Sequence, residues 1–99
     1  MHELIKNFID GEWVGAGKTI KNINPATGES IGDVVASGKA ETESAIAAAK
    51  RAFPAWRRVP APRRGDILVR AAVEMARRKD ELARALTLEE GKTLGEASG

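Results

Sequence analysis

The sequence predicts an α/β fold in which N-terminal β-hairpin strands are followed by three to four helices. Short β-prone stretches separated by glycine and Asn-Pro turns are typical of strands. Farther along, apolar residues recur at spacings of three and four, which is typical of amphipathic helices. We therefore expect one partial domain over residues 1–99, with strands at about 5–37, helices at about 39–56, 62–78 and 80–90, and the start of another helix at 93.

The first strands are predicted to form a hairpin about Asp10-Gly11. This dipeptide lies between Phe8-Ile9 and Trp13-Val14, which are strand-forming residues. A type I′ turn requires positive φ at both central residues, and Asp-Gly is among the dipeptides that allow it. We therefore expect two short strands within residues 4–14.

Two more strands are expected around an Asn-Pro turn. Residues 20–24 alternate in polarity, and Pro25 and Gly28 supply the φ angles of a turn. The chain then returns as a strand over residues 30–37. Gly32 inside this strand indicates a bulge or a close approach of the backbone.

The GAGKT stretch at 15–19 invites comparison with a phosphate-binding loop. That motif requires a glycine five residues before Gly17, where this sequence has Glu12, and a helix after it, where this sequence predicts a strand. A glycine turn between strands is the better interpretation. The later Gly91-Lys92-Thr93 fails the same test, because Leu86 occupies the glycine position.

The first helix is predicted to begin after Gly38, with Glu41 in its positive first turn. Pro54 is expected to kink or end this helix near Phe53. The two later helices meet at the charged stretch 77–80, and Gly91 suits the residue just beyond a helix end. Three apolar stripes are expected to face the core: Ala45, Ile46, Ala49, Ala52, Phe53 and Trp56; Ile67, Leu68, Ala71, Ala72 and Met75; and Leu82, Ala83 and Leu86.

Charge and composition exclude several classes of function. The net charge is only +2, so no nucleic-acid partner is expected. A basic cluster is interpreted as a solvated joint rather than a phosphate site, since no aromatic residue is interleaved with it; its members are Arg57, Arg58, Arg63 and Arg64. The lack of cysteine excludes disulfides and thiolate catalysis within these residues, and the single histidine, His2, is expected to be a solvated tail. No apolar run approaches the ~20 residues of a membrane span, and no signal peptide is visible, so we expect a cytoplasmic protein without a membrane partner.

Four pieces, in order, resemble the beginning of an aldehyde dehydrogenase: NFIDGEWV at 7–14, NPATGESIGDV at 24–34, AFPAWR at 52–57, and the long run from Pro60 to Ala97 that contains Glu-Glu-Gly-Lys. The resemblance covers essentially the whole chain. It implies the N-terminal part of a Rossmann-like cofactor domain in an enzyme that oxidises aldehydes with NAD or NADP. It also implies a partner in the remainder of that domain, and a homo-oligomer or self-association.

In that family a cysteine thiolate attacks the aldehyde, an asparagine holds the oxyanion and a glutamate activates water. None of these residues, nor the glycine-rich cofactor turn, lies in the matching segment. We therefore predict no catalytic or cofactor-binding residue here, and no cofactor bound to this segment alone. Some members hold a monovalent cation, and the matching positions are Ile23 and Glu89; the other interpretation of Glu89 is a solvated charge at a helix end.

The leading interpretation is an N-terminal fragment of an aldehyde dehydrogenase that is inactive alone. The alternative is a free-standing, non-catalytic interaction module that associates with itself through exposed apolar helix faces. A third is a nucleic-acid binder centred on the stretch 57–64. We also expect the apolar faces of the helices to need more protein than these 99 residues, because much of the apolar content is alanine and aromatic residues make up only 4% of the chain.

Overall fold

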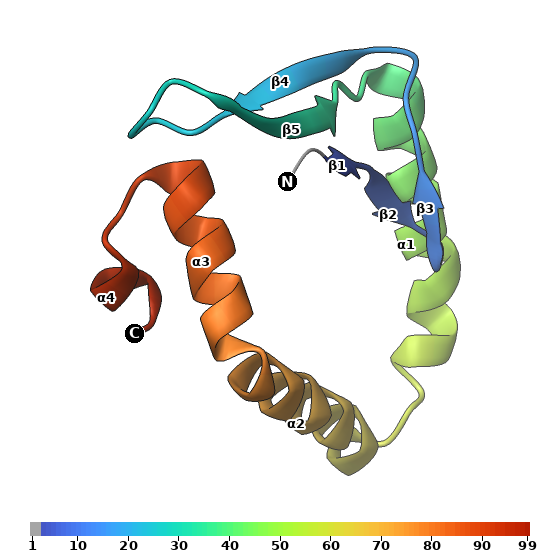
Figure 1. Ribbon diagram of the computed structural model, residues 1–99. Coiled ribbons are helices and arrows are strands. Elements are labelled where there is room, and N and C mark those ends of the chain that lie inside the picture. The colour runs from blue at the N-terminus through green and yellow to red at the C-terminus, as the bar shows by residue number, and fades with distance from the viewer. Residues whose placement is uncertain (1–2) are drawn as a thin grey trace. The chain divides into compact units, whose positions relative to one another are not determined.

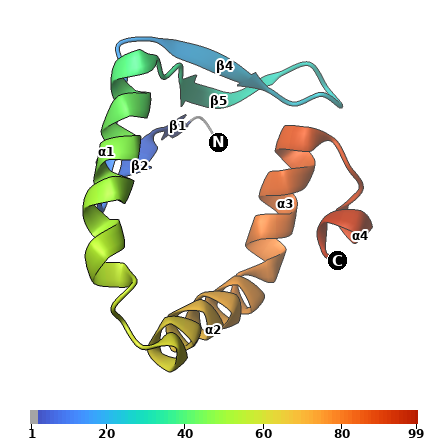
Figure 2. The same cartoon turned by 180° about the vertical axis from the view of Figure 1, so that it is seen from behind.

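The computed structural model describes residues 3–99 and has the predicted α/β character, with strands followed by helices (Figures 1 and 2). The elements, in order, are β1 (Glu3–Ile5), β2 (Asn7–Ile9), β3 (Glu12–Val14), β4 (Thr19–Ile23), β5 (Ser30–Val35), α1 (Lys39–Trp56), α2 (Ala61–Arg77), α3 (Lys79–Glu90) and α4 (Leu94–Ala97). They form two compact units. The first runs to Ile23 and resumes at Ser30–Arg58, and the second combines Asn24–Glu29 with Val59–Gly99.

The larger sheet of the first unit has the strand order β1-β5-β4. β5 pairs with β4 in antiparallel register and with β1 in parallel register. Asn22 lies opposite Gly32 and Ile23 lies opposite Ser30, so Ile31 is an extra residue on β5. The bulge predicted at Gly32 is therefore confirmed, and the positive φ of 148° at Gly32 shows why glycine occupies it.

The hairpin is confirmed as β2 and β3, with Phe8 opposite Trp13. Asp10 and Gly11 have φ values of 53° and 79°, as a type I′ turn requires. The sequence did not predict that the N-terminal strand would divide at Lys6, so that β1 joins β5 instead of extending the hairpin. This pairing links residues far apart in the sequence, and local alternation carries no signal for it.

Helix α1 covers the predicted range and starts at Gly38, whose backbone N–H donates to the Glu41 carboxylate at 2.8 Å. The helix continues through Pro54 and ends at Trp56, within the predicted range of 39–56, so Pro54 does not end it, and a kink there stays a prediction. A proline has no N–H for the bond to the carbonyl four residues back, and here the helix ends two residues later. In both views β2 lies along α1 (Figures 1 and 2).

The second unit contains α2, α3 and α4. A single residue, Arg78, separates α2 from α3. Gly91 ends α3 in the left-handed conformation, with φ 88°, as predicted. Thr93 then caps α4, because its hydroxyl accepts from the Glu96 backbone N–H at 3.3 Å.

Very little of the apolar surface is covered within this chain. Among the residues described, only Val35 and Ala83 are buried hydrophobic side chains, at 8% and 2% exposure. Phe53 and Trp56, which the sequence predicted to be core anchors, are 59% and 41% exposed. No helix within residues 3–99 combines the length and apolar character that crossing a membrane demands.

Candidate functional site

The two residues predicted to hold a cation lie in different units. Ile23 ends β4 in the first unit, and Glu89 lies in the last turn of α3 in the second. Residues 4–99 contain no group of three or more histidine, cysteine, aspartate or glutamate side chains arranged to hold a metal ion. The Ile23 and Glu89 pair stays a prediction.

The residues of this chain do not fit a dinucleotide. The GAGKT stretch leads into β4, so its interpretation as a turn between strands is confirmed. The N-terminus of α1 is already occupied by Glu41, and the Gly38 N–H that donates to this carboxylate lowers its pKa. Helix α2 begins with Pro62 in its first turn, and proline has no N–H to offer a phosphate.

The predicted arginine cluster makes local contacts within each unit. In the first unit, the Arg57 guanidinium lies 5.8 Å from the centre of the Phe53 ring, a cation–π arrangement. In the second, Arg64 Nε donates to the Val59 carbonyl at 3.1 Å, which fixes the entry into α2. These contacts give two of the four arginines a structural role. The prediction of a solvated joint stays a prediction for the cluster as a whole.

The first unit has an apolar surface on its β2–β3 hairpin, and polar contacts hold this hairpin in place. Asp10, in the hairpin turn, forms an ion pair with Arg51 of α1 at 3.3 Å. Asn7 Nδ2 donates to Ser37 Oγ at 2.6 Å, so the hairpin is tied at both ends. Each of these contacts is exposed, so each is expected to orient the hairpin more than it stabilises the unit.

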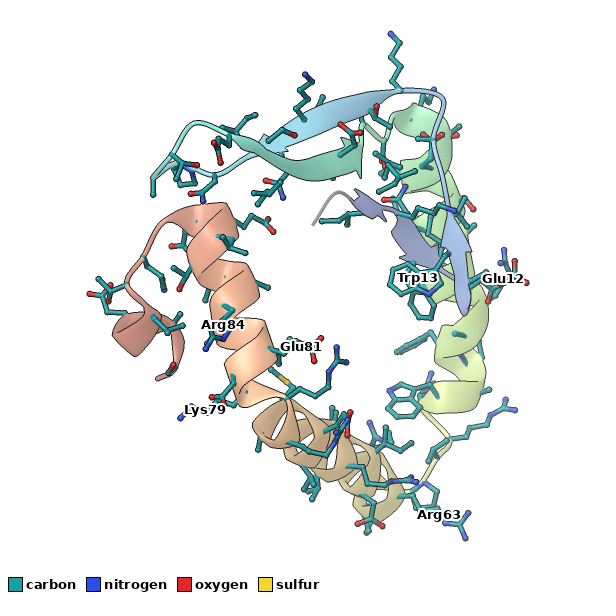
Figure 3. All side chains as sticks on the ribbon, in the orientation of Figure 1. Glu12, Trp13, Arg63, Lys79, Glu81 and Arg84 are labelled. Atoms are coloured by element: carbon teal, nitrogen blue, oxygen red, sulfur yellow. The ribbon has the colours of Figure 1, made fainter. Side chains whose placement is uncertain are left out.

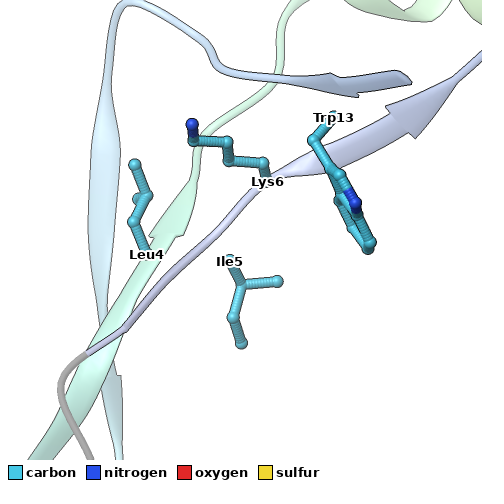
Figure 4. A pocket seen from close by; sticks show the side chains of 4 residues that line it. All are labelled: Leu4, Ile5, Lys6 and Trp13. Atoms are coloured by element: carbon cyan, nitrogen blue, oxygen red, sulfur yellow. The ribbon is translucent and has the colours of Figure 1, made fainter.

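The orientation of the hairpin displays its aromatic side chains. The Phe8 and Trp13 rings pack with centroids 4.9 Å apart and yet remain 62% and 70% exposed. Figure 3 shows the side chain of Trp13 on the hairpin. Beside Trp13, a shallow pocket is lined by Leu4, Ile5 and Lys6 (Figure 4). An aromatic and aliphatic surface of this kind is typical of a face that packs against other protein.

The second unit also leaves apolar side chains uncovered. A shallow pocket between α3 and α4 opens onto Leu82, Leu86 and Ala97, and Ala83 lies buried at its base. Ion pairs flank the junction of the long helices: Arg77 donates to Glu74, and Arg78 to Glu81, with shortest distances of 2.5 Å in each pair. These bonds lower the pKa of both glutamates.

The hydroxyl of Thr87 in α3 is buried and has no hydrogen-bond partner among the residues described. The sequence does not predict this feature, since a threonine within an amphipathic helix carries no pattern that marks it as buried. Val69 and Val73 of α2 were also not predicted; they lie outside the predicted stripe and are 61% and 64% exposed. Their separation by four residues was the available signal.

Each unit leaves large apolar side chains exposed. In the first unit these include Phe8, Trp13 and Phe53, and in the second they include Leu68 and Met75. Exposed apolar side chains that recur along one face are typical of a surface that packs against other protein.

Comparison with known proteins identifies related chains. The model of the aldehyde dehydrogenase family matches residues 13–99. Glutarate-semialdehyde dehydrogenase of Pseudomonas aeruginosa is 51% identical over 94 residues, and malonate-semialdehyde dehydrogenase 3 of Geobacillus kaustophilus is 48% identical over 97. These alignments cover 93% and 96% of this chain but 20% of each relative.

Solved structures give the same result for the fold. An NADP-dependent enzyme of E. coli superposes with a TM-score of 0.93 at 46% identity, over 95% of this chain and 20% of that one. A 1-pyrroline-5-carboxylate dehydrogenase from Thermus with bound NAD has a TM-score of 0.93 at 39% identity, over 98% and 19%. The chain spans about one fifth of the length of the relatives it matches.

Proposed function

Because the chain belongs to the aldehyde dehydrogenase family, we propose that it is the N-terminal segment of an NAD(P)-dependent enzyme that oxidises an aldehyde to a carboxylic acid. The family match over residues 13–99 carries this proposal. The reaction is that of the longer parent, since the chain spans about a fifth of its relatives. We place this parent in the cytoplasm, as the sequence predicts.

Within that parent, the segment has a supporting role. Its own sequence contains no cysteine to serve as the thiolate nucleophile. When bound to the parent, NAD or NADP supplies the hydride acceptor, and the residues of this segment do not fit that group. Their part is to present the hairpin and the helix faces to the remainder of the cofactor domain, which we propose as their partner.

The names of two relatives support a proposal for the substrate class. Two relatives with about half of their aligned residues identical act, by name, on glutarate semialdehyde and malonate semialdehyde. Both compounds carry a carboxylate as well as the aldehyde. The proposed substrate of the parent is therefore a semialdehyde of a dicarboxylic acid.

A chimera tests the proposal. Residues 1–99 replace the matching segment of the Pseudomonas aeruginosa glutarate-semialdehyde dehydrogenase, and formation of NADH or NADPH is followed with glutarate semialdehyde and with a simple alkyl aldehyde. We expect the chimera to oxidise the semialdehyde at a rate near that of the unmodified enzyme and to keep that enzyme's preference between the two aldehydes, and we expect the 99-residue chain alone to be inactive. Its matched control is a chimera in which Phe53→Asp places a charge on the apolar face of α1.

Two results would contradict the proposal. Turnover by the purified 99-residue chain would show that a catalytic site lies within it. A chimera that folds to the native oligomer but fails to oxidise any aldehyde would show that this segment is not interchangeable with that of the family. If Phe53→Asp left the chimera fully active and equally stable, the apolar face of α1 would not be the packing surface.

A further inference from the structure

The turn of the β2–β3 hairpin contains a reactive dipeptide that the proposed function leaves unused. Asp10 is the one aspartate of this chain that precedes a glycine. The other three are followed by larger residues, in the pairs Asp33-Val34, Asp66-Ile67 and Asp80-Glu81. Glycine has no Cβ to shield its own backbone nitrogen. The nitrogen of Gly11 can therefore attack the carboxyl carbon of Asp10 and close a succinimide ring.

The structure leaves room for this ring and also shows what restrains it. The Asp10 side chain is 72% exposed. Among the residues described, no atom beyond the chain neighbours of Gly11 lies within 4 Å of where its Cβ would stand. The restraint is Arg51 of α1, whose Nη2 lies 3.3 Å from Asp10 Oδ2. Ring closure requires the carboxyl group to swing toward the Gly11 nitrogen, and this ion pair opposes the movement.

We propose that Asp10 is a site of spontaneous isoaspartate formation and that Arg51 is a positioning residue that slows it. In the first step a bond forms between the Gly11 nitrogen and Asp10 Cγ, and a C–O bond of the carboxylic acid breaks. The oxygen leaves as water with the acid proton and the proton of the Gly11 N–H. In the second step water adds to the main-chain carbonyl of Asp10 in the ring and breaks its bond to nitrogen. The chain then runs through Cγ, and water is the sole reagent.

The modification would disrupt the hairpin, because an isoaspartyl residue adds one carbon atom to the main chain. A two-residue turn fixes the register of the strands that it joins. Here that register places Phe8 opposite Trp13, with ring centroids 4.9 Å apart. A longer main chain at Asp10 cannot keep this register, so the modified chain loses the aromatic pair. The inference is independent of the proposed function, since it uses residues of the first unit and water alone.

Peptide mapping of the intact 99-residue chain tests the proposal. The chain and its Arg51→Gln variant are kept for several weeks in warm neutral buffer and then digested with trypsin. The tryptic peptide 7–18 contains Asp10 as its one aspartate, and its isoaspartyl form elutes separately at the same mass. We expect this isomer to accumulate in both samples. Arg51→Gln should raise its rate of formation roughly two- to fivefold, which is what an exposed ion pair accounts for.

Three controls separate the ion pair from a general effect on the fold. Arg51→Lys keeps the charge and should form the isomer at nearly the original rate. Lys50→Gln removes the same charge from the neighbouring residue of α1 and should leave the rate unchanged. Added salt should speed the reaction in the original chain but not in Arg51→Gln, because salt screens exposed ion pairs. Urea, which opens the hairpin, should bring the original chain and Arg51→Gln to one common rate.

Several results would overturn the proposal. An absence of the isomer from peptide 7–18 would show that Asp10 is not a modification site. Isomer formation as fast at Asp33, Asp66 or Asp80 would show that the glycine has no part in it. Equal rates in Arg51→Gln and Lys50→Gln, or equal rates for the original chain in buffer and in urea, would remove the positioning role of Arg51. Hydrogen exchange over residues 7–14 that is no faster in the purified isomer would show that the hairpin survives the modification.

Discussion

The contact between Gly91 and Pro25 offers the sharpest test of the second unit. Gly91 ends α3 with φ 88°, and a Cβ atom built on it would lie 2.8 Å from Pro25 Cγ. Alanine would therefore meet two separate penalties. The left-handed backbone costs about 1–2 kcal/mol for a residue with a Cβ, and forcing an extra methyl into a filled space costs about 1–3 kcal/mol. We expect Gly91→Ala to lower the free energy of unfolding by about 2–5 kcal/mol.

Gly28 provides a matched control within the same unit. It has a similar φ of 76°, but nothing lies within 4 Å of where its Cβ would stand. Gly28→Ala should therefore cost only the backbone penalty of about 1–2 kcal/mol. Urea unfolding of each variant, followed by helical circular dichroism, gives the two costs, and their difference measures the clash with Pro25.

A third variant isolates the clash itself. Pro25→Ala removes Cγ, so combining it with Gly91→Ala should relieve the clash and recover the stability lost to it, while the backbone penalty remains. If Gly91→Ala cost no more than Gly28→Ala, or if Pro25→Ala failed to recover any stability, the loop at 24–29 would not pack on the end of α3 as the structure shows.

Three further predictions concern single side chains. The Gly38 N–H lowers the pKa of Glu41 below its usual 4.5. The contribution of this carboxylate to stability is therefore complete above about pH 4.5 and is lost as pH falls through the folded pKa. Glu41→Gln should flatten this part of the dependence of Tm on pH between about 3 and 6, and an unchanged profile would contradict the contact. Thr87→Val removes a buried, unpaired hydroxyl and should raise the free energy of unfolding of the isolated chain by about 1 kcal/mol, whereas a loss of that size would reveal a partner for it. Arg63→Gln should change stability by less than about 0.5 kcal/mol, while Arg64→Gln, measured by the same unfolding, should cost about 1 kcal/mol more through its bond to Val59; equal effects would refute this role.

Local chemistry in the sequence predicted the features that depend on neighbouring residues. The Asp10-Gly11 turn, the bulge at Gly32 and the left-handed Gly91 each follow from the φ angles that a residue type allows. Helix α1 followed from a repeat of apolar residues and an acidic first turn. In each case the determining contacts span only a few residues, so the sequence contains the information in one place.

Features that depend on distant residues were not accessible in the same way. The pairing of β1 with β5 joins Ile5 to Val34, and the choice between this partner and the hairpin is made by packing rather than by propensity. The close approach of Pro25 to Gly91, which leaves no space for a Cβ atom, likewise involves a loop far away in the chain. The candidate cation pair is harder still to predict from the sequence, since Ile23 and Glu89 belong to different units.

The apolar stripes themselves provide the strongest physical argument for missing protein. Periodic burial is what normally maintains such spacing on a helix, yet α1 and α2 contain no buried residue in this structure. Burying one Leu or Phe side chain contributes about 1.5–3 kcal/mol, and a whole domain has a net stability of only ~5–15 kcal/mol. Exposed side chains such as Phe53 and Leu68 therefore contribute little of the free energy that their burial would provide. Their regular spacing indicates that these helix faces pack against protein outside these 99 residues, and the family match supports the remainder of the parent enzyme as that protein.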